Sequence, residues 1–115
     1  MSIPNEYGTI TIENDVIARV AGLAAIDCYG IVGMAAKNIR DGLVQLLKMK
    51  SITKGVQLKI TESAITISLH IMVEYDTSIP AIADSIISTV KYRVKENIGL
   101  PVAGVNIFVE GVRAE

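Results

Sequence analysis

Cysteine and aromatic residues are scarce in this sequence of 115 residues, which contains one Cys, one Phe and no Trp. Because Cys28 is alone, no disulfide can form within the chain, and a reducing, cytoplasmic setting is favoured over a cross-linked secreted scaffold. The shortage of aromatic rings leaves little material for the stacking platforms that bind single-stranded nucleic acids. These shortages therefore argue against a small secreted domain held by disulfides and against a domain that binds single-stranded nucleic acids by aromatic stacking.

The sequence also lacks an excess of charge of one sign and lacks long apolar runs. The formal net charge is -1, so the chain as a whole has no attraction to nucleic acids or anionic lipids. No apolar run approaches the roughly 20 residues of a membrane span, and residues 1–5 lack the basic and apolar blocks of a signal peptide. A chain of this length can bury about 65% of its unfolded surface. We expect one domain over residues 1–115.

Groups that could carry out chemistry are few. His70 and Cys28 lie on different expected elements, and the sequence has no second His or Cys to complete a metal-ligand pair. His70 is expected on the outward face of a strand and Cys28 on the buried stripe of a helix, so a nucleophile and base are not expected to meet. A lone Cys most often packs in the core. We predict no catalytic residues, no metal and no cofactor.

Residues 55–75 contain two runs in which apolar and polar residues alternate. A period of two places the apolar side chains of a strand on one face, so the stretch predicts a β-hairpin. With Glu62 and Ser63 as the loop, the apolar pairs are Val56 with Leu69, Leu58 with Ile67 and Ile60 with Ile65. A slip by one residue would expose the whole set, which favours this register. A wider loop is an alternative, because Glu-Ser lacks the Gly or Asn of typical two-residue loops.

The remaining elements are predicted from their own patterns and packed around this hairpin. Strands are expected over 7–12, 31–36 and 105–109, and helices over 16–28 and from Ile79-Pro80 to Gly99. In the first strand, Ile10 and Ile12 are expected to point inward. Residues 37–54 are expected to form a short, mobile helix and a loop, from the helical spacing of Ile39, Leu43, Leu46 and Leu47. The predicted fold is α+β, with two main helices packed on one face of a mixed β-sheet built around the central hairpin.

The face of the sheet away from the helices is predicted to carry the polar positions of the alternating runs. These are Thr9, Thr11, Thr66, Ser68, His70, Met72, Asn106 and Phe108. Met72 and Phe108 are large apolar residues on a face that alternation assigns to water, which favours a partner there. Phe108 could instead cover a sheet edge or contact the segment after Lys37.

We predict an interaction surface formed by His70, Met72 and Phe108 that serves self-association or docking. Protonation of His70 is expected to weaken the contact as pH falls.

A second functional interpretation rests on Gly30 and Gly33, which are spaced as in the GxxG loop of one class of RNA-binding module. Such loops expose backbone amides to phosphate. Here the two central residues are Ile31 and Val32, which prefer burial, so tight packing between helix and strand is favoured over a nucleic-acid-binding turn. Binding through this turn and the lysines of residues 37–54 is the alternative function.

Short motifs spread along the chain carry a family resemblance. They are Tyr7-Gly8, Gly30-Ile31-Val32-Gly33-Met34, Lys54-Gly55-Val56, Glu74-Tyr75, Ile79-Pro80, and Gly99 with Val102 and Val105-Asn106-Ile107. In their order and spacing the sequence resembles the alkaline shock protein family of Gram-positive bacteria over almost its whole length, and most closely its short members. The resemblance implies a single domain of that family over residues 1–115.

The resemblance also implies a function. Family members are small non-enzymatic cytoplasmic proteins of cell-envelope homeostasis and of alkaline or general stress, often held near the membrane by a separate membrane-anchored protein. Short members are frequently encoded beside a kinase-like protein, which implies a link to lipid metabolism. The expected partners are therefore further copies of the chain and an unidentified, membrane-anchored protein. No catalytic residue is carried over.

Overall fold

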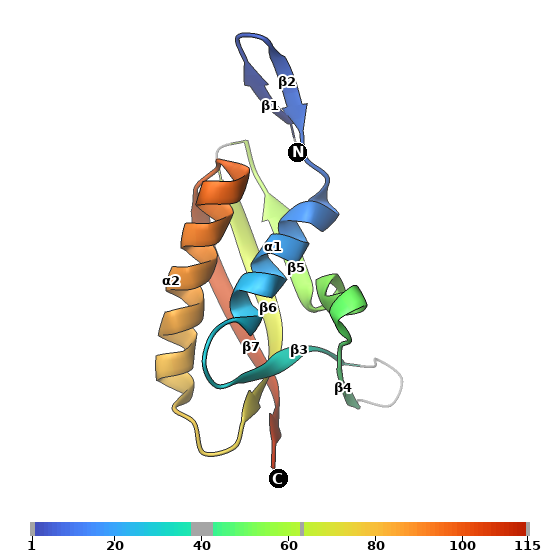
Figure 1. The fold of residues 1–115 in the computed structure, drawn as a ribbon, viewed down its shortest axis with the longest axis vertical. Coiled ribbons are helices and arrows are strands. Elements are labelled where there is room, and N and C mark those ends of the chain that lie inside the picture. Colours follow the sequence, from blue (N-terminus) through green and yellow to red (C-terminus); the bar gives the residue numbers. More distant parts are fainter. Residues whose placement is uncertain (1, 38–42, 63, 115) are drawn as a thin grey trace.

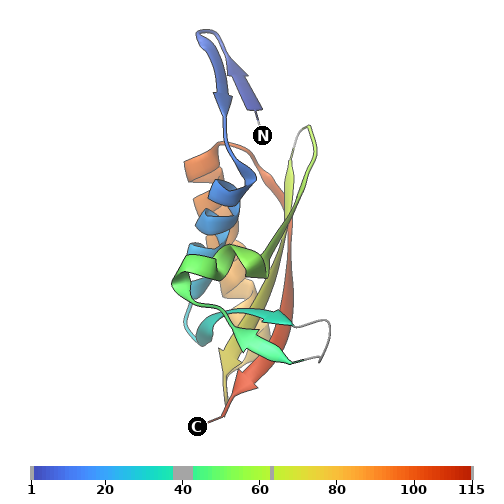
Figure 2. The same cartoon turned by 90° about the vertical axis from the view of Figure 1, so that its right-hand side faces the viewer.

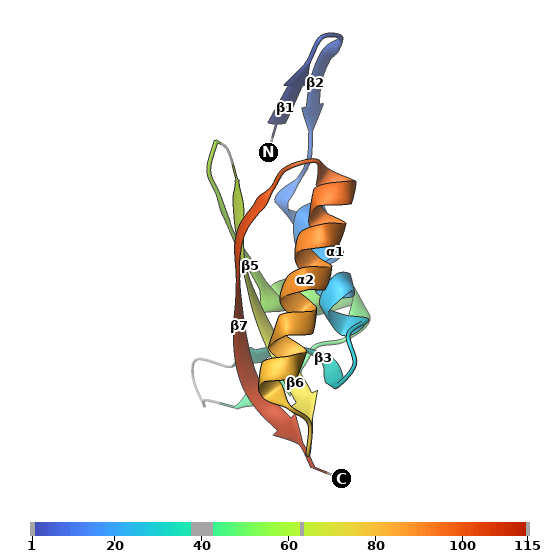
Figure 3. The same ribbon diagram turned by 90° about the vertical axis from the view of Figure 1, so that its left-hand side faces the viewer.

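The computed structural model describes residues 2–37, 43–62 and 64–114. They form a two-layer α+β structure in which two main helices lie on one face of a mixed sheet, as predicted (Figure 1). Figures 2 and 3 show this sheet from its two edges, with both helices on the same side of it. In chain order the elements are β1 (Ser2–Asn5), β2 (Gly8–Thr11), α1 (Asn14–Ile26), β3 (Ile31–Lys37), β4 (Val44–Leu46), the 3-10 helix η1 (Met49–Gly55), β5 (Val56–Ile60), β6 (Ile65–Glu74), α2 (Ile79–Ile98) and β7 (Val102–Arg113).

Strand β6 is the centre of the sheet. It pairs antiparallel with β5 along its first half and with β3 along its second half, and β7 lies parallel to it on its other side. The predicted hairpin register is confirmed, with Val56 opposite Leu69, Leu58 opposite Ile67 and Ile60 opposite Ile65. The hairpin closes through a hydrogen bond from the Thr61 amide to the Ala64 carbonyl. Of the two predicted loop residues, Ser63 lies outside the described residues.

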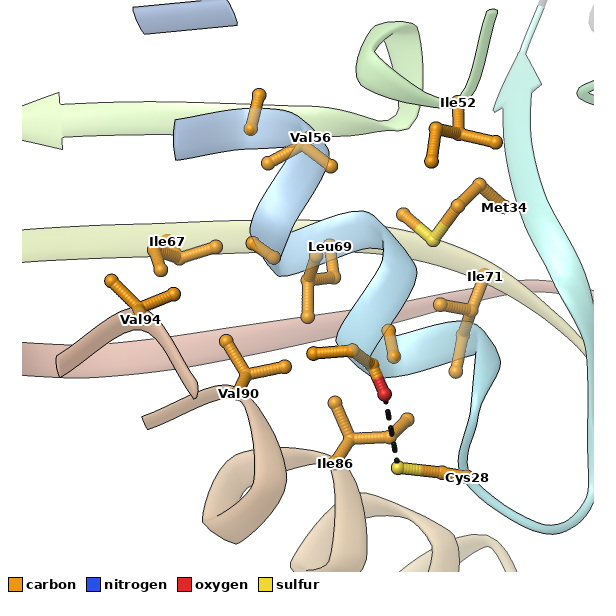
Figure 4. Packing of buried hydrophobic residues seen from close by; sticks show 14 of the residues in the cluster. Cys28, Met34, Ile52, Val56, Ile67, Leu69, Ile71, Ile86, Val90 and Val94 are labelled. Atoms are coloured by element: carbon orange, nitrogen blue, oxygen red, sulfur yellow. Dashed lines mark hydrogen bonds between the residues drawn. The ribbon is translucent and has the colours of Figure 1, made fainter. Parts of the chain in front are cut away.

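The core lies between β6 and the two helices. Every second residue of β6 is buried toward the helices: Ile65, Ile67, Leu69, Ile71 and Val73. Figure 4 shows Ile67 pointing toward Val94 of α2, with Leu69 packed beneath α1. Cys28 is buried, and its thiol donates a hydrogen bond to the carbonyl of Ala24. The interpretation of this cysteine as a core residue is therefore confirmed.

Helix α2 begins and ends at the residues that its sequence indicates. The Ser78 side chain accepts a hydrogen bond from the Ala81 amide, and Pro80 stands in the first turn, where its missing N–H costs no helical hydrogen bond. Gly99 follows the helix with a φ of 91°, the left-handed conformation that glycine adopts without a steric penalty. The helix buries one residue per turn: Ile82, Ile86, Val90, Val94 and Ile98.

Residues 37–54 differ from the prediction. Residues 44–46 form strand β4, which pairs with β3, and a 3-10 helix follows at Met49–Gly55. The helical spacing that suggested otherwise depended partly on Ile39, which lies outside the described residues. Leu46 and Leu47 were placed on one helical stripe, but here they point to opposite sides, with Leu46 against Gly33 and Leu47 against Gly55.

The first strand also differs from the prediction. Rather than joining the main sheet, Gly8–Thr11 pairs with Ser2–Asn5 to form a separate two-stranded hairpin, which we call the arm (Figure 1). All of β2 is exposed, and Ile10, which was expected to point inward, is 50% exposed. Ile12, just after the strand, does pack against the core. Alternation identified the strand correctly, but it could not say that this strand lies away from the body.

Candidate interaction surface

The three predicted site residues lie together on the face of the sheet that the helices leave uncovered. His70 of β6 and Phe108 of β7 are direct neighbours in the parallel register, and Met72 lies on the same face two residues further along β6. Ser68 and Asn106 are neighbours on this face too, as predicted. Thr9 and Thr11 were also expected here, and this was wrong because their strand belongs to the arm.

The centre of the surface is a stack of His70 on Phe108. Their ring centroids are 4.8 Å apart and their planes differ by 11°. His70 Nδ1 lies 2.8 Å from Oε1 of Glu110. A shift in the β6–β7 register falls between Ile71 and Met72, which pair with Val109 and Gly111, so Glu110 is the extra residue of a bulge. Glu110 lies two residues beyond Phe108 on the same face, and its carboxylate reaches the ring of His70.

This hydrogen bond fixes the tautomer of neutral His70. An ionised carboxylate can only accept, so Nδ1 must carry the proton and donate it to Glu110. Nε2 is then a lone-pair acceptor, and it is buried with no hydrogen-bond partner among the described residues. The side chains of His70 and Glu110 are 23% and 19% exposed, so the pair is partly shielded from water. When the ring gains a second proton, the same contact becomes an ion pair.

An apolar patch adjoins the stack. Met72 and Val44 of β4 both lie against Gly111, where a side chain would meet Met72 Cε at 3.4 Å and Val44 Cγ1 at 3.8 Å. Leu46 of β4 covers Gly33 of β3, the residue that pairs with Met72. Leu46 and Phe108 are 42% and 47% exposed. We call these six residues the open-face cluster: Val44, Leu46, His70, Met72, Phe108 and Glu110.

Three members of the open-face cluster were not found from the sequence. Glu110 follows a strand pattern whose alternation would place it on the same face as Phe108, but the predicted strand ended at residue 109. Val44 and Leu46 were assigned to a loop and a helix. Residues 44–46, Val-Gln-Leu, do alternate, yet three residues are too few for that signal to outweigh a competing helical pattern.

The glycine turn does not form an exposed phosphate loop. A side chain on Gly30 would meet Ile82 Cδ1 of α2 at 2.7 Å, and the Gly30 carbonyl accepts a hydrogen bond from the Glu74 amide. Gly33 is buried beneath Leu46. Both glycines thus permit close packing, which is the interpretation that the sequence favoured.

The described chain offers neither a metal site nor a membrane span. Over residues 2–37, 43–62 and 64–114, no three His, Cys, Asp or Glu side chains lie close enough together to bind a metal ion. In the same residues, no helix has the length and apolar character needed to span a membrane.

Comparison with known proteins decides the family. Residues 2–114 match the alkaline shock protein 23 family, described as having a cell envelope-related function. The chain belongs to this family. It is 48% identical to the protein YloU of Bacillus subtilis (strain 168) over 114 residues, which covers 98% of this chain and 95% of YloU. The resemblance that the short motifs carried is thereby confirmed.

Two further comparisons relate the chain to a longer family member and to a solved fold. It is 31% identical to a stress response regulator gls24 homolog of Streptococcus pyogenes serotype M3, over 94% of this chain and 60% of that protein. The solved structure of MamM-CTD H264A superposes with a TM-score of 0.53 at 15% identity, covering 89% of this chain and all of the other. At that identity the likeness shows a shared fold alone.

Proposed function

We propose that this member of the alkaline shock protein family is a non-enzymatic, cytoplasmic interaction module of cell-envelope and alkaline-stress homeostasis, and that the open-face cluster is its contact surface for self-association. The cell envelope-related description of the family and the name of the stress response regulator gls24 homolog support the physiological setting. The contact surface is argued from the chain itself.

One observation carries the proposal: large apolar side chains gather on the sheet face that no helix of the described chain covers. Phe108 and Leu46 are each more than two-fifths exposed, and they flank the half-buried Met72. Scattered exposed apolar residues are ordinary, but a contiguous group that includes an aromatic ring is typical of a protein contact. Its polar members, His70 and Glu110, are hydrogen-bonded to each other, so a partner could cover them at low cost.

The family resemblance extends this proposal to a second partner, a membrane-anchored protein that holds the chain near the envelope, and to a link with lipid metabolism. Both are tested by purifying the protein from its native cell and identifying what comes with it. Wild type and Phe108→Ser should be compared, because a partner bound through the open-face cluster is lost from the variant alone.

Sedimentation velocity across a concentration series tests self-association directly. Phe108→Ser should weaken association, because it removes the most exposed apolar member of the open-face cluster. Tyr92→Ser is the matched control, since Tyr92 is an exposed aromatic residue, 68% accessible, on α2 in the other layer. Equal sedimentation of wild type and Phe108→Ser would contradict the proposal.

A further inference from the structure

The arm carries another apolar surface that the described chain leaves partly uncovered. Ile10 of β2 is 50% exposed, and its direct cross-strand neighbour is the half-buried Ile3 of β1, so the two side chains share one face of the ribbon. Tyr7 in the turn is 92% exposed. In all three ribbon views the tip of the arm projects beyond the helices and the main sheet (Figures 1, 2 and 3).

A two-stranded hairpin is at best marginally stable in water without a surface to pack on. The base of the arm borders the turn between β5 and β6, where Ser2, Ile3 and Pro4 face Ile60 and Leu100. Further from the base, Ile10 is 50% exposed, although the alternation of its strand is the pattern of a half-buried strand. Such a conflict between local pattern and observed exposure is expected where a contact is made with another molecule.

We propose that the arm docks through its Ile3–Ile10 face on the open-face cluster of a second copy of this chain. The inference rests on the proposed function, since it names the element that covers the surface assigned there to self-association. Two uncovered apolar surfaces on one chain can satisfy each other whenever two copies meet, without a third protein.

Geometry requires that this contact be made between copies. The arm lies at one end of the long axis, and β4 with the adjoining ends of β3 and β6 lies toward the other end (Figure 1). The longest extent is 54 Å, so the arm of a chain cannot fold back onto its own open-face cluster without remodelling the body between them.

The charges of the two surfaces are compatible. The two strands of the arm contain no charged side chain, and the turn between them adds only Glu6. The open-face cluster presents apolar side chains around the Glu110 carboxylate, which already accepts a hydrogen bond from His70. A ribbon with no charged side chain in its strands can therefore cover the cluster without separating this pair.

The test compares an arm variant with a cluster variant by sedimentation velocity. Ile10→Ser and Phe108→Ser should each lower the self-association constant by about tenfold or more, the equivalent of roughly 1.4 kcal/mol. Thr9→Ala is the matched control for the arm, because Thr9 lies on the opposite face of β2. Leu46→Ser is a second cluster variant, needed if urea titration shows that Phe108→Ser has lost its fold. Retained association of Ile10→Ser would overturn the proposal.

Mixing the two variants gives the sharper result. The Ile10→Ser chain keeps an intact cluster and the Phe108→Ser chain keeps an intact arm, so the mixture should associate more strongly than either variant alone. No gain on mixing would overturn arm docking. If Phe108→Ser abolishes association while Ile10→Ser does not, the open-face cluster remains the contact surface and the arm is excluded. If both variants match wild type, the proposed function fails as well.

Discussion

Replacing Ile67 by Ala tests the assignment of the two faces of the sheet. Ile67 is fully buried on β6, in the cluster that β6 forms with α2. The substitution removes three carbon groups at about 0.8 kcal/mol each, or about 2.4 kcal/mol of lost burial. The cavity left behind adds to this, because the helix above can collapse only partly, and substitutions of this kind cost about 2–5 kcal/mol in all. We expect a loss of about 3–4 kcal/mol.

Urea unfolding followed by circular dichroism measures this loss. With a slope of about 1.5–2 kcal/mol per M, the midpoint should fall by about 2 M. Thr66→Ala is the matched control, because Thr66 is the preceding residue on the opposite, uncovered face and is only partly buried. It should cost less than about 1 kcal/mol. Similar midpoints for the two variants would show that the faces are assigned the wrong way round.

Two further predictions concern a close approach and an ion pair. Gly30→Ala should cost more than about 2 kcal/mol in urea titration, since φ is 90° and the new methyl would overlap α2, whereas Gly99→Ala, with φ of 91° and open space, should cost about 1 kcal/mol. Arg93→Ala breaks an exposed ion pair and should lower the unfolding free energy by less than about 1 kcal/mol, with a larger loss contradicting that estimate.

The central hairpin and α2 could be predicted because several local signals agree there. Alternation set the register of β5 and β6, and the cap at Ser78 and the left-handed Gly99 marked the limits of α2. The full length of β7 could not be predicted from the sequence in the same way. The sequence indicated a strand at residues 105–109, but the structure extends it to Val102–Arg113 through two register shifts, and bulges leave no clear mark in a pattern of period two.

The rest of the candidate site depended on contacts between segments distant in sequence. His70, Met72 and Phe108 could be assigned to one face from alternation alone. The hydrogen bond to Glu110 was missed because the predicted strand ended at residue 109, and the cover over Gly33 depends on the three-residue strand β4. The arm was missed because its first strand, Ser2–Asn5, is short and contains a proline. Such a segment gives a weak strand signal, so the partner of β2 could not be recognised.

Polarity changes along the open face, and this change supports the proposed position of the contact. Toward the start of β6 the face carries Thr66 and Ser68, whose neighbours on β7 are Gly104 and Asn106. These positions suit water and offer a partner little apolar area. Around Met72 the face is apolar and is bordered by β4, and the Glu74–Arg113 ion pair lies beyond this patch at the end of β6. A partner that gains by excluding water is therefore expected at the patch beside β4, far from the arm of the same chain. In the proposed pair of copies, the arm of one would align with the β4 end of the other.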